Sequence, residues 1–478
     1  MKFLLLIPAI LLVFIAVILI RALSFKPKEN AKVFEEEVHL DRELICERLC
    51  RLVRCKTVSY KDASLEDNAE FEKLIAMLPE LYPNVFEKCT FTQLEDRGLL
   101  FKWEGQKEGA PAVMMAHYDV VPARPELWDK PPFDAVTEDG VIWGRGTLDT
   151  KGTFNGVLSA ADQLISEGFT PEYDMYFAFS GNEEINGRGA INIVDWFESN
   201  GITPSLVVDE GGAVVENVFP GVKSPCGVIG IAEKGMMDVE YKVRSNGGHA
   251  SSPKPDSPIV LLSKACLKLE NNPFKAHITK PVAEMFDTLG RHSSFLYRII
   301  FANLWCFSGL LDMICKKSGG ELNAIMRTTV AFTKMNGSRA ANVIPPEASL
   351  VSNMRLNPMD NMDSALEYLK KTVDDERVEI RIIEGMNPSR ISETYCPAWD
   401  KVASAVASTW KGCIVSPYLM MQCSDSRHYG RISDKVYRFS AMDLTKEERA
   451  SIHGNNERIR VDCACRAVEF YIRLMKQC

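Results

Sequence analysis

The chain begins with a long apolar run that stops at the first group of basic residues. Residues 3–20 carry no charge, and as an α-helix they are about as long as the hydrocarbon core of a bilayer is thick. A cleaved signal peptide has a shorter apolar core and a small-residue cleavage site, neither of which is evident here. We therefore expect an uncleaved transmembrane anchor at residues 1–21 and a polar, basic linker at residues 22–35.

The charges around the apolar run leave its orientation open. Lys2 on a very short N-terminal tail favours a cytosolic N-terminus, whereas the heavier charge of Arg21, Lys26 and Lys28 favours the reverse. We expect a single-pass membrane protein whose body lies on a side that these charges do not decide.

Short β-rich runs alternate with amphipathic helical stretches across residues 36–228. The runs include "APAVMMAHYDV", "MYFAFS" and "SLVVDE", and one of the helical stretches is "TFNGVLSAADQLISEG". This alternation predicts the first part of an α/β catalytic domain, with a mostly parallel sheet between layers of helices. Such sheets bind ligands at the carboxyl ends of their strands.

The pattern changes at residues 229–391, and the α/β alternation returns at residues 392–478. The changed region is predicted as strand, helix, two strands, helix and strand, the outline of an α+β, ferredoxin-like domain with one antiparallel sheet. We therefore expect a small domain inserted into the catalytic domain, whose second part is residues 392–478.

Residues 294–315 within the insertion are unusually apolar and aromatic. A second membrane span is one interpretation, but Arg298 and Asp312 would be costly in lipid. We favour a helical hairpin that packs against the domain, a partner or an apolar substrate tail.

Composition narrows the choice of partners. The 56 basic and 64 acidic residues give a net charge of −8 without long blocks of one sign, so there is no electrostatic case for a nucleic-acid partner. A small molecule or a peptide is the expected substrate. The 14 cysteines form neither a compact disulfide framework nor a paired zinc-binding motif.

Polar residues stand at the predicted ends of the strands. His117 and Asp119 are two residues apart, so both project to one face of an extended chain. Alone, this pair is typical of a protein surface, and Asp149 in its glycine-rich turn is typical of a helix cap. The other members of the set are Glu183, Glu184, Asp209, Glu210 and His453. Together these imidazoles and carboxylates suit Zn²⁺ or a similar divalent ion, and they suffice for two ions that share one carboxylate, with a further carboxylate as base.

Six motifs in order carry a resemblance to a known family: "HYDVVPA", "WGRGTLDTKG", "GNEEINGRGA", "VVDEGGA", "GGHASSP" and "IHGNNERI". With them the chain resembles the di-zinc aminoacylase/carboxypeptidase family of metallopeptidases, and most closely its carboxypeptidase S and N-fatty-acyl-amino-acid hydrolase branch. The resemblance covers essentially everything after the linker.

The resemblance implies a role for each polar residue at the strand ends. One zinc would be held by His117 and Asp209, the other by Glu184 and His453, with Asp149 as the bridge. Asp119 would orient His117. Glu183 would be the general base that takes a proton from the water between the metals and delivers it to the leaving amine.

For the inserted domain the resemblance implies a lid that also allows a homodimer. His249 looks like the histidine that stabilises the tetrahedral oxyanion, often in the partner's active site. Asn342 and Arg355 match positions associated with substrate contact, although turn hydrogen bonds and a surface ion pair explain them equally well.

One motif departs from the family. Asp425 and Arg427 of "DSRHY" are kept as substrate-binding candidates, but Gln422, Cys423 and Ser424 replace the usual turn before them. We expect this altered turn to line the substrate pocket.

The expected function is a membrane-anchored zinc hydrolase of amide bonds next to an amino acid with a free carboxylate. Its substrate would be a small peptide or an N-acyl amino acid, and its cofactor two Zn²⁺ per subunit, with Co²⁺ and Mn²⁺ as alternatives. A dipeptidase or aminopeptidase of the same family stays an alternative, as does a non-catalytic binding protein on the same fold.

Overall fold

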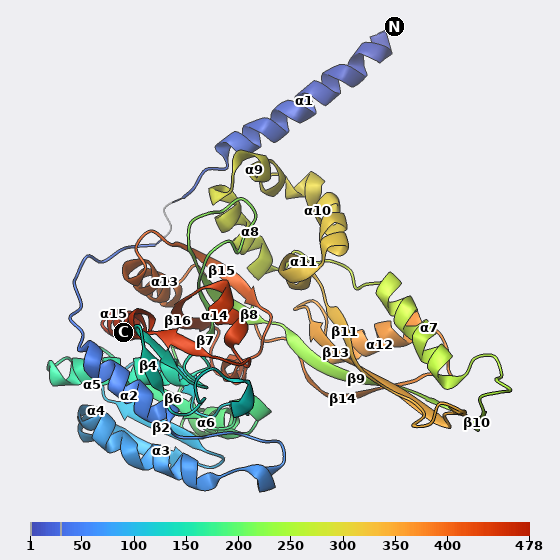
Figure 1. Ribbon diagram of the computed structural model, residues 1–478. Coiled ribbons are helices and arrows are strands. Elements are labelled where there is room, and N and C mark those ends of the chain that lie inside the picture. The colour runs from blue at the N-terminus through green and yellow to red at the C-terminus, as the bar shows by residue number, and fades with distance from the viewer. Residues whose placement is uncertain (1, 29–30) are drawn as a thin grey trace.

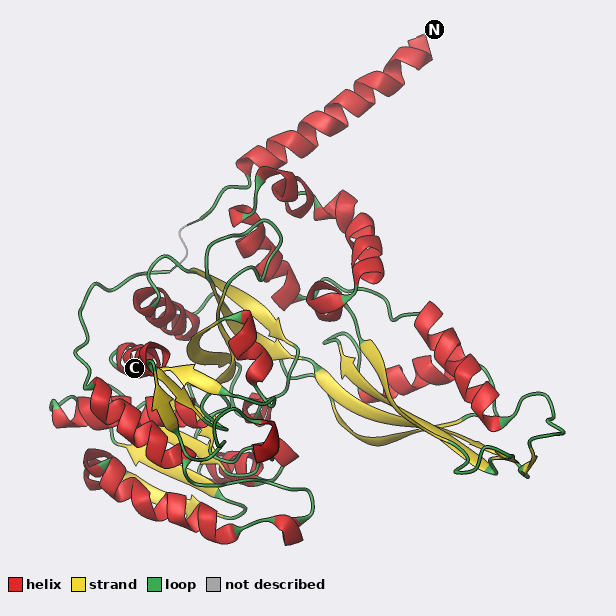
Figure 2. Ribbon diagram, viewed as in Figure 1, coloured by secondary structure: helices red, strands yellow, loops and turns green. Residues whose placement is uncertain are grey.

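The computed structural model describes residues 2–28 and 31–478. Within them the chain forms a large mixed sheet between helices, a small antiparallel sheet beside it, and a long N-terminal helix that projects from the body (Figure 1). Figure 2 shows that helices cover both sheets, whereas α1 (Lys2–Ser24) lies largely outside the body.

The large sheet has eight strands in the described residues. Their order is β1 (Thr90–Leu94), β2 (Gly98–Trp103), β6 (Met175–Ser180), β3 (Ala112–His117), β7 (Leu206–Val215), β16 (Val436–Leu444), β8 (Cys226–Glu233) and β15 (Ile414–Met420). The central strands β6, β3, β7 and β16 are mutually parallel, and β15 is parallel to β8.

The expectation of a mostly parallel sheet is wrong at the two sides, where β1–β2, β2–β6, β7–β8 and β16–β8 are antiparallel. One cause is local. Asp96 and Arg97, with φ of 52° and 62°, form a tight turn between β1 and β2. The last pair of this ladder is Leu94 with Gly98, so the three residues 95–97 reverse the chain.

Helices cover both faces of the large sheet. One face carries α2 (Arg42–Val53), α3 (Asn68–Leu81), α4 (Pro83–Lys88), α5 (Lys151–Ser166), α13 (Pro397–Thr409) and α15 (Val461–Met475). The other face carries α6 (Gly189–Ser199). The residues of α5 are buried on nearly every side, since the helix lies between the sheet and α15. This central helix begins two residues after Asp149 and so fixes the glycine-rich turn at the sheet edge.

The small sheet has four antiparallel strands in the described part of the chain. Their order is β11 (Thr329–Asn336), β13 (Glu347–Leu356), β9 (Gly235–Arg244) and β14 (Glu379–Met386). Buried and exposed residues alternate along β9 and β13, and α7 (Pro258–Asn271) and α12 (Met362–Val373) pack on the buried face. This is the strand and helix order that the sequence predicted. Since β8 runs on to Glu233, the chain passes from the large sheet to the small one at Lys234 rather than at residue 229.

Four helices within the insertion pack away from the small sheet. They are α8 (Lys280–His292), α9 (Phe295–Phe301), α10 (Leu304–Ser318) and α11 (Gly320–Met326). Side chains of Phe286, Phe301 and Leu311 share an apolar cluster with Val228 and Met442 of the large sheet. The apolar segment 294–315 therefore forms two helices, bent by 106° to one another, that are seated on the large domain.

Shorter elements complete the chain. A separate three-stranded sheet near the carboxyl edge of the large sheet consists of β4 (Val136–Glu138), β5 (Val141–Trp143) and β17 (Arg458–Arg460). In the insertion, β10 (Gly248–His249) pairs with β12 (Val343–Ile344). The helix α14 (Lys446–Ser451) follows β16. By length and composition, Ile7–Ser24 of α1 is long and apolar enough to cross a membrane or to act as a signal sequence.

Candidate metal centre

Two histidines meet on one carboxylate at the carboxyl edge of the large sheet. His117 is the last residue of β3, and Asp149 directly precedes Thr150 and α5. His117 Nε2 lies 3.0 Å from Asp149 Oδ1, and His453 Nε2 lies 2.9 Å from Asp149 Oδ2. Each oxygen of Asp149 thus faces a different imidazole, the arrangement of a carboxylate that bridges two ions.

A further carboxylate completes each half of the centre. Glu210 Oε1 lies 3.5 Å from His117 Nε2, and Glu184 Oε2 lies 3.0 Å from His453 Nε2. Ligand atoms of His117, Asp149 and Glu184, and likewise of His117, Glu183 and Glu210, lie within 4.8 Å of one another.

The donor set fits two divalent cations. Three carboxylates and two imidazoles without a thiolate are suitable ligands for Zn²⁺ in a hydrolytic site. Glu184 Oε1 is buried and has no hydrogen-bond partner among the described residues. A buried carboxylate oxygen without a partner is costly, and coordination to a cation would offset that cost.

The pKa values report the same crowding of negative charge. Burial, with help from Asp149, raises the pKa of Glu210 to about 8. Hydrogen bonds with Asp149 and Glu184 raise the pKa of His453 to about 10. Burial raises the pKa of the Asp149 carboxyl, but the two imidazoles lower it by more and hold it well below its usual range. The cluster therefore favours bound positive charge.

Glu183 lies beside these ligands. Burial raises the pKa of Glu183 well above its usual range, and the carboxylates of Asp425 and Glu210 add to the rise. A carboxyl group with a raised pKa next to a metal-ligand cluster is suited to accept and return a proton.

Asp119 holds two parts of the centre together. Its two oxygens accept hydrogen bonds from the backbone N–H groups of Glu183 (3.1 Å) and Glu184 (3.2 Å). The Oδ1 atom also lies 3.3 Å from His117 Nδ1. Asp119 thus orients the imidazole of His117 and fixes the loop after β6.

Glu210, rather than Asp209, faces His117. Arg438 of β16 pairs with Asp209 and the next residue, Phe439, pairs with Gly212, so Glu210 and Gly211 form a bulge in β7. Gly211 has φ of 145°, and a Cβ there would lie 2.4 Å from Met420 Sδ. The bulge turns Glu210 toward the centre, while Asp209 accepts a 2.9 Å hydrogen bond from the Ser426 N–H.

Glu457 supports the centre, although no role for it was expected from its motif. It is fully buried and accepts hydrogen bonds from Arg145 Nη1 at 2.7 Å and from the N–H groups of Gly146, Leu148 and Asp149 at 3.0, 2.8 and 3.2 Å. Glu457 therefore fixes the glycine-rich turn that presents Asp149. Its position four residues after His453, within a motif already noted, was the available signal.

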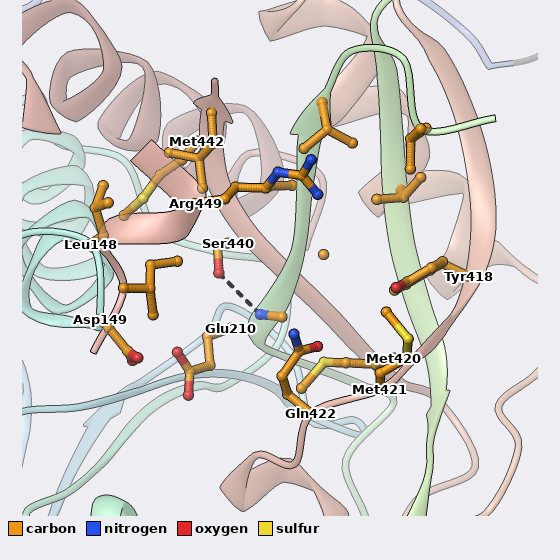
Figure 3. Close-up of a pocket in the computed structure, with 18 of the residues that line it drawn as sticks. Leu148, Asp149, Glu210, Tyr418, Met420, Met421, Gln422, Ser440, Met442 and Arg449 are labelled. Carbon is orange, nitrogen blue, oxygen red and sulfur yellow. Dashed lines mark hydrogen bonds between the residues drawn. The ribbon is translucent and has the colours of Figure 1, made fainter. Parts of the chain in front are cut away.

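A cavity of about 580 Å³ opens from the centre. Asp149, Glu183, Glu210 and His453 line one end of it. The walls beyond are mainly apolar and come from β7, β15 and β16, with Arg449 farther from the carboxylates (Figure 3). Gln422 and Cys423 also line it, as the sequence predicted for this turn.

Two arginines lie near the same cavity. Arg427 Nη2 donates to Glu233 Oε2 at 3.0 Å, whereas its Nε and Nη1 are buried without a partner among the described residues. Arg355 Nη1 lies 3.4 Å from Cys423 Sγ. Asp425 lies behind them, where it accepts a hydrogen bond from Ser180 Oγ, and burial raises the pKa of Asp425 to about 7.

His249 and Asn342 lie far from this centre within one chain. Both lie at the tip of the small sheet, where β10 pairs with β12 (Figure 1). His249 is exposed, and its Nδ1 lies 2.7 Å from Ser251 Oγ. The backbone oxygen of Asn342 accepts from Ala250 N–H at 3.0 Å.

A mixed α/β sheet with clustered imidazoles and carboxylates at its carboxyl edge defines a metal-dependent hydrolase. The chain belongs to the peptidase family M20/M25/M40, whose model matches residues 113–477. It is therefore a hydrolytic enzyme, as the sequence predicted.

Two relatives belong to the branch that the motifs indicated. A probable carboxypeptidase S-like 2 of Dictyostelium discoideum is 33% identical over 90% of this chain and 84% of its own length. The N-fatty-acyl-amino acid synthase/hydrolase PM20D1 of Xenopus tropicalis is 34% identical over 98% of this chain and 93% of its own.

Solved structures share the fold. The M20 family metallo-carboxypeptidase Sso-CP2 of Sulfolobus solfataricus has a TM-score of 0.66 at 18% identity, over 92% of this chain and 99% of its own. A Bacillus subtilis protein described as a dinuclear metal-binding M20 peptidase has a TM-score of 0.55 at 12% identity, over 91% and 98%.

Proposed function

We propose that this protein is a di-zinc hydrolase that cleaves the amide bond between a long acyl group and an amino acid with a free carboxylate. The supporting observation is the cavity, whose apolar walls begin next to Asp149 and Glu210. Its volume is within the range of ligand pockets, and its lining suits a hydrocarbon chain. The Xenopus relative carries an N-fatty-acyl-amino acid activity in its name.

The metal ligands in this proposal fall into two groups. His117, Asp149 and Glu210 would hold one Zn²⁺, and Asp149, Glu184 and His453 would hold the other. Glu210 thus replaces Asp209 in the ligand set that the sequence suggested. Zinc supplies Lewis acidity toward the amide carbonyl and lowers the pKa of water; Co²⁺ or Mn²⁺ would serve similarly.

Glu183 is the proposed general base and acid. It accepts a proton from the attacking water as the C–O bond forms, and it returns that proton to the amide nitrogen as the C–N bond breaks. The products are a fatty acid and an amino acid, so the hydrolysis needs no other reactant.

Arg427 and Arg355 are the proposed partners of the substrate carboxylate. The buried Nε and Nη1 of Arg427 would donate to it, and a charge-assisted pair of this kind also fixes the orientation of the substrate. Asp425 would support the loop that carries Arg427 rather than contact the substrate itself.

The inserted domain, predicted from the sequence as residues 229–391, is the proposed lid and dimerisation domain. His249 lies at its exposed tip, near Asn342, so in this proposal a second copy of the chain brings His249 to the oxyanion. The N-terminal helix is the proposed anchor, because its 18-residue stretch Ile7–Ser24 is only 11% buried. Carbonate extraction and N-terminal sequencing of the mature protein test the anchor.

The substrate proposal is tested on the full chain in detergent with added Zn²⁺. We expect turnover of N-oleoyl-phenylalanine to exceed that of N-blocked dipeptides with C-terminal phenylalanine, and Glu183→Gln to abolish both. Activity confined to the dipeptides would instead assign a carboxypeptidase. Activity confined to dipeptides with a free amine would assign a dipeptidase.

A further inference from the structure

The helices α9 and α10 expose apolar side chains on a surface that, among the described residues, only α1 approaches. Leu296 is 73% exposed, Trp305 58% and Met313 60%. Phe295, Tyr297, Leu310 and Ile314 are exposed on the same two helices. This set of seven residues is the apolar platform.

The opposite face of the helix pair is buried against the large domain. The ring of Phe301 stacks 4.6 Å from that of Phe219 and 5.3 Å from that of Phe286, and Leu311 and Cys315 are buried in the same cluster. The pair is therefore anchored on the large domain, and the apolar platform is the face that points away from it.

The N-terminal helix runs against the apolar platform. Arg21 Nε donates to Ala302 O and Asn303 Nδ2 donates to Ile18 O, both at 3.1 Å. The ring of Trp305 contacts that of Phe14 at 5.7 Å. Figure 1 shows α9 at the base of α1, with α10 beside it. The apolar surfaces of α1 and the platform are thus contiguous.

This contact sets the depth of the platform. Phe14 lies seven residues before Arg21, so Trp305 contacts α1 about 10 Å along the helix axis from the first basic residue. An interfacial helix is buried to about the same depth, 5–10 Å. If α1 crosses a bilayer, Trp305 lies at the boundary of headgroups and acyl chains, where tryptophan is enriched.

Of the two charges that argue against a second span, Arg298 lies over the ring of Phe295 at 5.9 Å, whereas Asp312 has basic partners of its own. Asp312 pairs with the buried Arg327 and, at 3.0 Å, with Lys316. Lys316 and Lys317 stand in the last turn of α10, where long basic side chains can reach lipid headgroups. An interfacial position therefore costs none of the desolvation that a span through Asp312 would cost.

From these contacts we infer that α9 and α10 are an in-plane membrane element, whose apolar platform inserts into the leaflet next to the body of the protein. The inference rests on the proposed anchor for its depth. The occupant of the platform is the acyl region of phospholipids, and the seven residues are its contact surface.

Trp305 is a native reporter of this placement. It is the one tryptophan among residues 280–326, and α1 has none. The full chain is reconstituted in vesicles of phosphatidylcholine and phosphatidylglycerol, with or without brominated acyl chains that quench tryptophan fluorescence on contact. We expect Trp305→Phe to remove most of the quenched signal, and Trp196→Phe in α6 to leave it unchanged.

A second pair of variants separates the apolar platform from the anchor. Met313→Glu should lower the quenching of Trp305 about twofold or more, since a charge at the interface opposes insertion. Met359→Glu, at an equally exposed methionine of the small domain, should not. The inference would be overturned if the protein stays in the vesicles during carbonate extraction but Trp305→Phe and the parent chain are quenched equally. In that case the proposed anchor would still hold. A chain that carbonate extracts from the vesicles would overturn both.

Discussion

The large and the small sheet hold their histidines in opposite settings. At the edge of the large sheet, His117 has three carboxylates within 3.5 Å and His453 has two. His249, at the tip of the small sheet, is exposed and has Ser251 Oγ beside it. The first setting is built in advance for cations, whereas the second acquires a role only when another surface approaches. In the proposed mechanism the metal centre is therefore assembled by one chain, whereas the oxyanion partner comes from a second copy.

The strongest test of this comparison distinguishes the roles of Glu183 and Glu184, the adjacent glutamates that follow β6 of the large sheet. Glu183→Ala should lower kcat by about 10⁴-fold or more while metal content stays near that of the parent, because a general base is removed and no ligand. Glu184→Ala should lose metal as well, since its carboxylate contacts His453. Metal analysis by mass spectrometry and steady-state kinetics measure both. Metal loss in Glu183→Ala would contradict the division of roles.

The second test asks whether His249 acts across subunits. His249→Ala should lower kcat about 10²–10³-fold, as loss of an oxyanion donor does, without loss of metal. A mixture of His249→Ala and Glu183→Ala chains should recover about a quarter of the parent activity, since half of the dimers are mixed and each has one intact site.

Two outcomes of these experiments would contradict the prediction. No recovery in the mixture, with dimers present by light scattering, would mean that His249 acts within its own chain. Unchanged kcat in His249→Ala would remove the small sheet from catalysis.

The third test concerns the bulge in β7. Glu210→Gln should weaken one of the two metal sites by about 100-fold or more, because a direct ligand is lost. Asp209→Asn should keep both ions, since Asp209 accepts a hydrogen bond from Ser426 instead. Titration with a zinc chelator measures the difference. Greater metal loss in Asp209→Asn would restore the ligand set that the motif alone suggested.

This bulge shows where prediction from the sequence stops. The strand ends could be predicted, because apolar runs that stop at polar residues already place His117, Asp149, Glu184 and His453 at one edge. The choice between Asp209 and Glu210 could not, since it depends on a bulge that forms only when β16 pairs with β7. The role of Glu457 likewise depends on a turn more than 300 residues away.

The same limit explains the helices of the insertion. The apolar faces of α8 to α11 could be predicted from the sequence, but the surface that covers each face could not. The structure seats α8 on β15 and α9 against α1, and not on the small sheet that flanks them in the chain. Local pattern thus predicts elements and their buried faces, whereas the pairing of distant faces is decided by packing.

The last and smallest effect is the pH dependence of stability after metal removal. In the metal-free protein the pKa of His453 is raised to about 10 and that of Glu210 to about 8. A raised pKa in the folded state means that the stabilisation is complete below the unfolded pKa and is lost as pH rises through the folded one. The Tm of the chelator-treated protein should therefore fall, by a few degrees, between about pH 4.5 and 10 relative to the metal-loaded protein.

Bound cations replace these protons, so the loaded protein should show no such fall. His453→Asn should flatten the difference, and His39→Asn, at an exposed histidine outside the centre, should not. A metal-free protein whose Tm rises over this range would show that the carboxylates, rather than their protonated partners, dominate the charge balance of the cluster.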